Sequence, residues 1–96
     1  MSEKHDGWEK VEFEAEEPKP VTVTMLTTRT GAGKLFGAGR VYVTLFGTEV
    51  RCVALRAGDE KYIIQPEHGP NWLVERGLDR ATAEQLVNDA MNQPEE

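Results

Sequence analysis

Four glycines stand within nine residues, where a Gly-Ala-Gly-basic pattern occurs at residues 31–34 and again at 37–40. Glycine leaves backbone N–H groups open to surround an anion, so this stretch first suggests a phosphate-binding loop. The spacing does not fit, because a P-loop requires Ser or Thr after its Lys, and Lys34 is followed by an apolar residue. We expect a loop or hairpin tip instead. The residues predicted to contact a partner from this tip are Lys34, Leu35 and Phe36.

A histidine and the single cysteine are the next candidates for chemistry. His68 has the chemistry of a general base, but no Ser or Cys motif accompanies it to supply a nucleophile. Cys52 stands at an apolar position of a strand pattern, which is typical of a small core residue. One cysteine and two widely separated histidines do not make a zinc cluster. We therefore predict no catalytic residue, no metal site, no cofactor and no enzymatic activity.

Three glutamates near the start of the chain alternate with apolar residues. They are Glu12, Glu14 and Glu16, and they alternate with Val11, Phe13 and Ala15. This period of two is typical of a strand with one solvated face, so we do not expect a catalytic pair of carboxylates. We interpret the three glutamates as an acidic rim, which steers a partner or presents a phosphate-like row to it.

Basic and aromatic residues mix on one face of the central strands. Bases stack on aromatic rings while arginine neutralises phosphate, so such a face is typical of single-stranded nucleic-acid binding. The same aromatic residues would serve equally as core beneath a helix or at a dimer seam. The residues predicted to contact a partner here are Arg40, Tyr42, Phe46 and Arg51, and Thr44 and Tyr62 lie on the same face.

Five segments carry the β-branched and alternating patterns of strands. The predicted strands are residues 8–15, 21–28, 41–46, 50–55 and 61–65. Gly47-Thr48 predicts a two-residue type II′ turn between the third and fourth strands, which places Val41 opposite Ala54. A second tight connection at Gly58-Asp59 brings the fifth strand alongside the fourth.

Both faces of this predicted sheet are apolar. One face holds Val41, Val43, Leu45, Val50, Cys52, Ala54 and Ile63; the other holds Tyr42, Phe46, Val53, Leu55, Tyr62 and Ile64. A sheet with one solvated face would alternate cleanly between apolar and polar residues, so each face needs a cover. A helix covers one of them. The other is covered by the first two strands, curled into a small barrel, or by a second copy of the chain in a dimer.

The pattern becomes helical after Pro66. Pro70 suits a first helical position, Gly77 suits the end of a short helical segment, and Asp79 suits the cap of the next helix. That helix carries one apolar stripe, formed by Ala83, Leu86, Val87, Ala90 and Met91. The predicted fold is therefore α+β: a small antiparallel β-meander or partly closed barrel of about five strands with a C-terminal helix.

Length and composition set the class of protein. The 96 residues have room for a single domain, predicted at residues 8–92, with a flexible N-terminus at 1–7 and a flexible tail at 93–96. No run approaches the roughly 20 apolar residues of a membrane span, and the start lacks the apolar core of a secretory signal. We expect a cytoplasmic protein that makes no contact with a membrane.

The formal net charge of −6 is unevenly distributed. Residues 1–20 carry −4, residues 21–62 carry +3 and residues 63–96 carry −5. The basic middle segment leaves a polyanionic partner open as an alternative. We expect a small non-enzymatic binding protein that regulates or inhibits a protein partner, and the alternative is a nucleic-acid-binding module using the basic and aromatic face of the central strands.

The order of several segments resembles a known family. These segments are Val23 to Arg29, Gly33-Lys34, Val41 to Leu45, Val50 to Gly58 and Tyr62-Ile-Ile-Gln-Pro66. Over residues 21–66 they look like the sheet of the septation regulator family, the stage V sporulation protein G family. The resemblance implies a strand meander followed by a C-terminal helix, dimer formation and nucleic-acid contact. The Glu-rich first strand has no counterpart in that family, and the resemblance assigns no functional residue.

Overall fold

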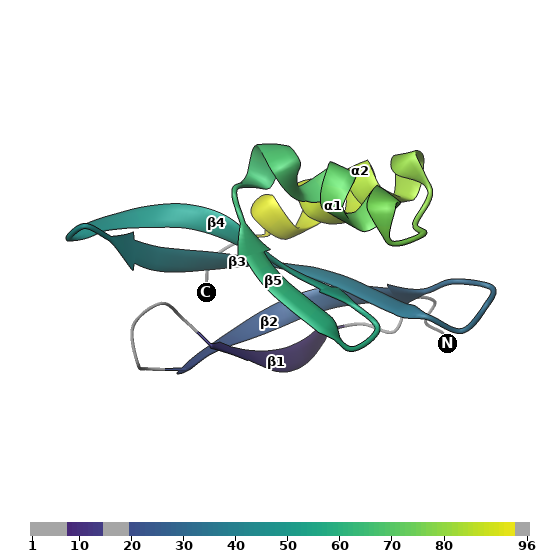
Figure 1. Ribbon diagram of the computed structural model, residues 1–96, viewed down its shortest axis with the longest axis horizontal. Helices are drawn as coiled ribbons and strands as arrows, with labels where there is room; N and C mark the ends of the chain where they lie inside the picture. The colour runs from purple at the N-terminus through teal and green to yellow at the C-terminus, as the bar shows by residue number, and fades with distance from the viewer. Residues whose placement is uncertain (1–7, 15–19, 94–96) are drawn as a thin grey trace.

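The computed structural model describes residues 8–14 and 20–93, in which five antiparallel strands follow one another in sequence order (Figure 1). They are β1 (Trp8–Glu14), β2 (Pro20–Arg29), β3 (Leu35–Leu45), β4 (Thr48–Ala57) and β5 (Glu60–Ile64). A short 3-10 helix, η1 (Pro66–His68), leads into α1 (Gly69–Glu75) and α2 (Arg80–Met91). The predicted α+β meander is confirmed, and its sheet curls into a half-barrel. The predicted flexible segment 1–7, residue Glu16 and residues 94–96 lie outside the described residues.

The hairpin of β3 and β4 corrects the predicted register. Its turn is Phe46-Gly47 rather than Gly47-Thr48, so Val41 pairs with Cys52 and not with Ala54. Both turn residues have positive φ, 51° for Phe46 and 79° for Gly47, as a type I′ turn requires. Because each partner moves by two residues, every side chain keeps its predicted face.

The glycine-rich stretch is a strand over half of its length, which corrects the predicted loop at residues 31–39. The backbone N–H of Thr30 donates to the Lys34 carbonyl and that of Gly33 donates to the Thr30 carbonyl; these bonds close the actual turn, and β3 begins at Leu35. Gly39 allows β2 to cross β3 closely, because a Cβ at this position would lie 2.6 Å from the carbonyl oxygen of Thr24. Gly39 is therefore a buried strand residue where the sequence predicted a loop or hairpin tip.

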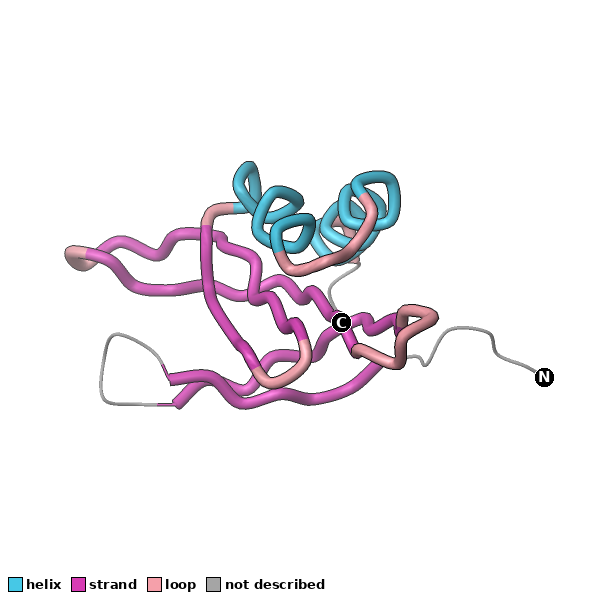
Figure 2. The backbone as a smooth tube through the Cα atoms, turned by 45° about the vertical axis from the view of Figure 1, so that its right-hand side comes forward, coloured by secondary structure: helices cyan, strands magenta, loops and turns pink. Residues whose placement is uncertain are grey.

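The helices cover one face of the sheet, as Figure 2 shows. Trp72 and Leu73 of α1, with the apolar stripe of α2, pack against alternate residues of β3 and β4. We call this layer the outer core, and its buried residues are Phe36, Ala38, Val53, Leu55, Ala57, Trp72, Leu73, Leu78, Ala83, Leu86, Val87 and Ala90. The predicted helix stripe and its role as a cover are confirmed.

The opposite face lies inside the curl of the sheet. Strands β1 and β2 cover it, which is the first of the two predicted covers. We call this layer the inner core, and its buried residues are Val11, Phe13, Val23, Met25, Val41, Cys52 and Ala54. Half-buried Val21, Val43, Val50 and Ile63 extend it toward an open side. The sorting of β3 and β4 side chains between two apolar faces is therefore confirmed.

The helix ends follow the predicted capping signals. Gly77 has a φ of 113° just after α1, a conformation that glycine adopts without the steric penalty of a Cβ. Asp79 caps α2, and its Oδ2 accepts a hydrogen bond of 3.0 Å from the backbone N–H of Thr82. These short-range signals fix the helix pair that covers the outer core.

Candidate functional site

The predicted contact tip at residues 34–36 is corrected by the structure. Phe36 is 0% exposed and belongs to the outer core. Lys34 donates a hydrogen bond of 3.0 Å from Nζ to the carbonyl of Arg76, and Nζ lies 5.4 Å from the centroid of the Phe36 ring. Leu35 is half-buried at the start of β3. Residues 34–36 therefore connect the turn between β2 and β3 to the helix layer. Phe36 is buried because it lies on β3, and the sequence analysis did not predict a strand at this position.

Most basic residues of the central strands donate to other parts of the same molecule. Arg40 reaches the carbonyl of Met91 at 3.3 Å, where a cation complements the C-terminal end of α2. Arg56 pairs with Glu9 at 2.9 Å, and its side chain lies on the concave face, away from that of Arg40. Further bonds run from Arg29 to the Gly33 carbonyl and from Lys61 to the Glu12 carbonyl. The predicted positive charge is therefore divided between the two faces of the sheet.

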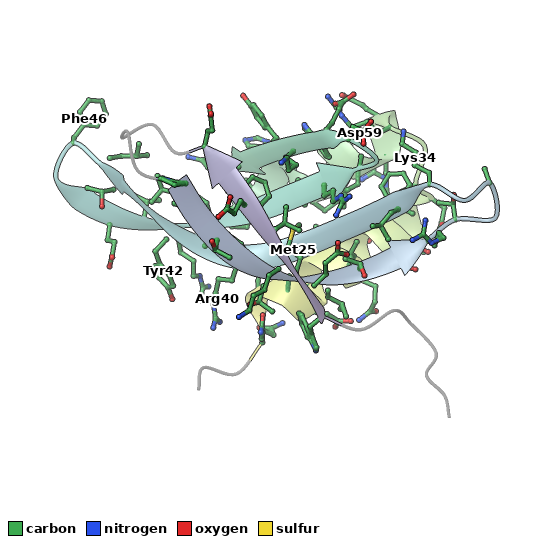
Figure 3. All side chains as sticks on the ribbon, turned by 90° about the horizontal axis from the view of Figure 1, so that it is seen from below. Met25, Lys34, Arg40, Tyr42, Phe46 and Asp59 are labelled. Atoms are coloured by element: carbon green, nitrogen blue, oxygen red, sulfur yellow. The ribbon has the colours of Figure 1, made fainter. Side chains whose placement is uncertain are left out.

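The far end of the β3–β4 hairpin is the most exposed aromatic region. It projects past the helices in Figure 1. Tyr42 is 45% exposed and stands directly opposite the exposed Arg51, and Phe46 at the turn is fully exposed. We call these three residues the hairpin patch. Figure 3 shows Phe46 at the tip of this hairpin and Lys34 at the opposite end of the molecule, so the predicted contact residues form two separate groups.

Phe46 combines two unfavourable properties. Its φ of 51° lies in the left-handed region, where a bulky side chain is strained at a cost of roughly 1–3 kcal/mol. Asparagine or glycine commonly fills this position of a type I′ turn. The fully exposed ring recovers no burial energy within the chain. A partner that buries the ring would supply that energy.

Tyr62 lies with α1 and not with the hairpin patch, although the sequence placed both on one face. Its ring is parallel to that of Trp72, with 6.3 Å between centroids. The guanidinium of Arg76 lies 4.0 Å from the Trp72 centroid and bonds to Glu60 at 2.8 Å. These contacts attach α1 to the outer edge of β5.

A groove of about 910 Å³ lies between β1 and β5, on the open side of the inner core. Its lining is apolar toward the inside and charged at the rim. The apolar lining includes Phe13, Val43, Leu45, Cys52 and Ile63, and the charged lining is Glu12, Glu14, Asp59 and Lys61. The sequence placed Val43, Leu45, Cys52 and Ile63 on a face that needs a cover. It did not show that the cover is incomplete, because the opening depends on the curl of the whole sheet.

Two of the three glutamates of the predicted acidic rim lie among the described residues. Glu12 and Glu14 alternate with the buried Val11 and Phe13, and both glutamates are exposed. The third predicted member, Glu16, lies outside the described residues. Glu12 and Glu14 therefore place negative charge along one side of the groove.

The cysteine and the histidine occupy different environments. Burial raises the pKa of the Cys52 thiol, which keeps it protonated at neutral pH and weakens it as a nucleophile. His68 is exposed, with Nε2 3.6 Å from Glu67 Oε2. Among residues 8–14 and 20–93, no three or more His, Cys, Asp or Glu residues are grouped to hold a metal ion.

The fold and these surfaces define a small α+β protein with a curled five-stranded meander and a helix pair. No protein-family model matches the chain, and no curated protein or solved structure matches it either. The resemblance of residues 21–66 to the septation regulator family therefore stays a prediction. Within the described part of the chain, no helix has the length and hydropathy needed to cross a membrane.

Proposed function

We propose that this protein is a small non-enzymatic regulator or inhibitor that binds another protein through the hairpin patch. The observation that supports this proposal is that the ring of Phe46 is fully exposed while its backbone has a left-handed turn conformation. A strained, exposed aromatic side chain is a cost to the isolated chain, and burial in a partner's apolar pocket offsets it.

The neighbours of Phe46 support a protein interface. Tyrosine and arginine are enriched among the residues that dominate binding energy, and Tyr42 and Arg51 are direct cross-strand partners behind the tip. The predicted nucleic-acid alternative uses the same face with Arg40. A protein partner is favoured over nucleic acid because Arg40 is bonded to the end of α2 and the remaining basic residues are spread over both faces of the sheet.

Affinity capture with matched variants tests the proposal. Wild type, Phe46→Asn and Trp8→Ser are used as baits, because Trp8 is an aromatic residue exposed to a similar degree as Tyr42 but lies on β1. We expect a protein that is captured by wild type and Trp8→Ser and is at least tenfold depleted with Phe46→Asn. That protein is then purified and its affinity is measured by calorimetry.

Identical capture by all three baits contradicts the role of the patch. A single-stranded oligothymidine titration at low salt separates the alternative. Binding that weakens with Arg51→Ala and falls as salt rises favours the nucleic-acid module.

A further inference from the structure

The half-barrel has two strand edges that face its opening. Strands β1 and β5 are the outermost strands of the sheet, and no backbone ladder joins them among residues 8–14 and 20–93. The Nζ of Lys61 crosses the opening instead and donates to the carbonyl of Glu12 at 3.2 Å. Hydrogen-bonded strands lie about 4.8 Å apart, a spacing that leaves no room for a side chain between them. Because the Lys61 side chain spans from β5 to the backbone of β1, these two strands lie further apart than hydrogen-bonded neighbours.

The outward backbone groups can be assigned to residues. Lys61 bonds to the carbonyl of Glu12, so Glu12 directs its backbone groups toward the opening, and alternation gives Lys10 and Glu14 the same direction. On β5, Glu60 pairs with Ala57 across a two-residue turn, so Glu60 directs its backbone groups toward β4. Alternation then directs the backbone groups of Lys61 and Ile63 away from β4, toward the opening. Each edge therefore presents a row of donors and acceptors to the groove.

The groove between these edges suits the side chains of a strand. Successive residues of a strand point to opposite faces, so alternate side chains of an added strand would enter the apolar interior near Val43, Leu45 and Ile63. The remaining side chains would face outward beside the rim. Exposed Glu12, Glu14 and Asp59 outnumber Lys61 there, which favours positive charge on the outward side chains.

We propose that the groove binds an extended segment of a partner protein, with alternating apolar and basic residues, as an added strand between β1 and β5. The added strand completes the barrel with main-chain hydrogen bonds on both sides. Lys61 leaves the Glu12 carbonyl when the segment enters. This site is separate from the hairpin patch and does not depend on it.

A synthetic peptide tests the proposal directly. The probe is a capped eight-residue peptide of alternating valine and lysine, titrated into the full chain at low salt. Three matched peptides serve as controls: one with glutamate in place of lysine, one with all lysines before all valines, and one with N-methyl groups on alternate amides. We expect each control to bind at least tenfold more weakly than the probe, and amide exchange to slow at Glu12, Lys61 and Ile63 when the probe binds.

Protein variants locate the site. Glu12→Lys with Glu14→Lys changes only exposed side chains, so the fold is retained, and we expect binding of the lysine peptide to fall at least tenfold. Lys61→Ala removes the bridge and one positive charge, and a two- to fivefold gain in affinity is expected. Phe46→Asn leaves peptide affinity unchanged, so failure here and failure of the hairpin patch are distinguished.

Three outcomes overturn the proposal. One is the absence of binding at low salt. A second is equal affinity for the alternating and block peptides, which shows charge attraction without strand addition. The third is a dimer in sedimentation whose β1 and β5 amides are already protected without peptide, which assigns the groove to a second copy of the chain.

Discussion

The outer and inner cores lie on opposite faces of β3 and β4 and share out the alternate residues of these two strands, yet they differ in completeness. Phe36 and Leu55 point to the helices and are 0% exposed. Val43 and Val50 point into the curl and remain half-buried. Two helices bring a continuous apolar layer to the outer face, whereas β1 and β2 cover only part of the inner one. One side of the sheet therefore serves stability, and the other is left with an open apolar surface.

The largest expected difference comes from the same substitution in the outer core and at the mouth of the groove beside the inner core. Leu55→Ala removes a fully buried side chain beneath the helices and is expected to lower the free energy of unfolding by about 3–5 kcal/mol. Leu45→Ala removes a half-buried side chain at the mouth of the groove, and the expected loss is about 1 kcal/mol. Urea unfolding followed by tryptophan fluorescence measures both. Equal losses would mean that the inner core is as closed as the outer one.

A smaller effect is expected where β2 crosses β3. Gly39→Ala places a Cβ 2.6 Å from the backbone oxygen of Thr24 and 2.7 Å from a methyl carbon of Val23, so the strands must separate. We expect a loss of about 1–3 kcal/mol by urea unfolding. Gly31→Ala is the matched control, since its Cβ meets nothing within 4 Å. A Gly39→Ala variant as stable as this control would show that the crossing tolerates a wider spacing.

Local features of β3, β4 and the α2 cap could be predicted from the sequence, and contacts between strands could not. Alternation and capping are local, so the faces of β3 and β4 and the cap at Asp79 were predicted. The strand character of Gly39 was not, because its reason lies in Thr24, a residue of another strand. The turn was predicted one residue too late, at Gly47-Thr48, because a type II′ turn has glycine at its first central position. The observed type I′ turn at Phe46-Gly47 has glycine at its second central position.

The candidate site divides in the same way. Tyr42, Phe46 and Arg51 were predicted from residue type and are exposed. Phe36 was predicted with them and is buried, since the start of β3 was not recognised. The groove between β1 and β5 depends on the curvature of five strands, which no local pattern encodes. Excess apolar surface on both faces of the sheet was the one available signal.

The tip of the hairpin offers a gain in stability. Phe46→Asn places a residue that tolerates the left-handed conformation at φ 51°, and the exposed ring it removes contributes no burial. We expect the free energy of unfolding to rise by about 0.5–1 kcal/mol while partner capture is lost. Urea unfolding and the capture assay are run on the same sample. A loss of stability would show that Phe46 is retained for the fold and not for binding.

The smallest effect is a pH dependence on the helix side. The backbone N–H of Thr82 donates a hydrogen bond to the Asp79 carboxylate, and the Thr82 hydroxyl donates a second one. These bonds lower the pKa of the Asp79 carboxyl below its ordinary value, and the backbone bond has the larger effect. A lowered folded pKa gives stability that is complete above the unfolded pKa, near 3.9, and is lost as pH falls through the folded value.

Asp79→Asn keeps a capping acceptor and does not titrate, so wild type is expected to lose its advantage over this variant as the pH falls from about 5 toward 2. The measurement is the urea midpoint of both proteins across this range, with Asp89→Asn as the control for removing one negative charge from the same helix. A pH-independent difference between wild type and Asp79→Asn would mean that the cap acts through geometry alone. In that case the helices would be held over the outer core by packing, and the negative charge of Asp79 would contribute nothing to the free energy of unfolding.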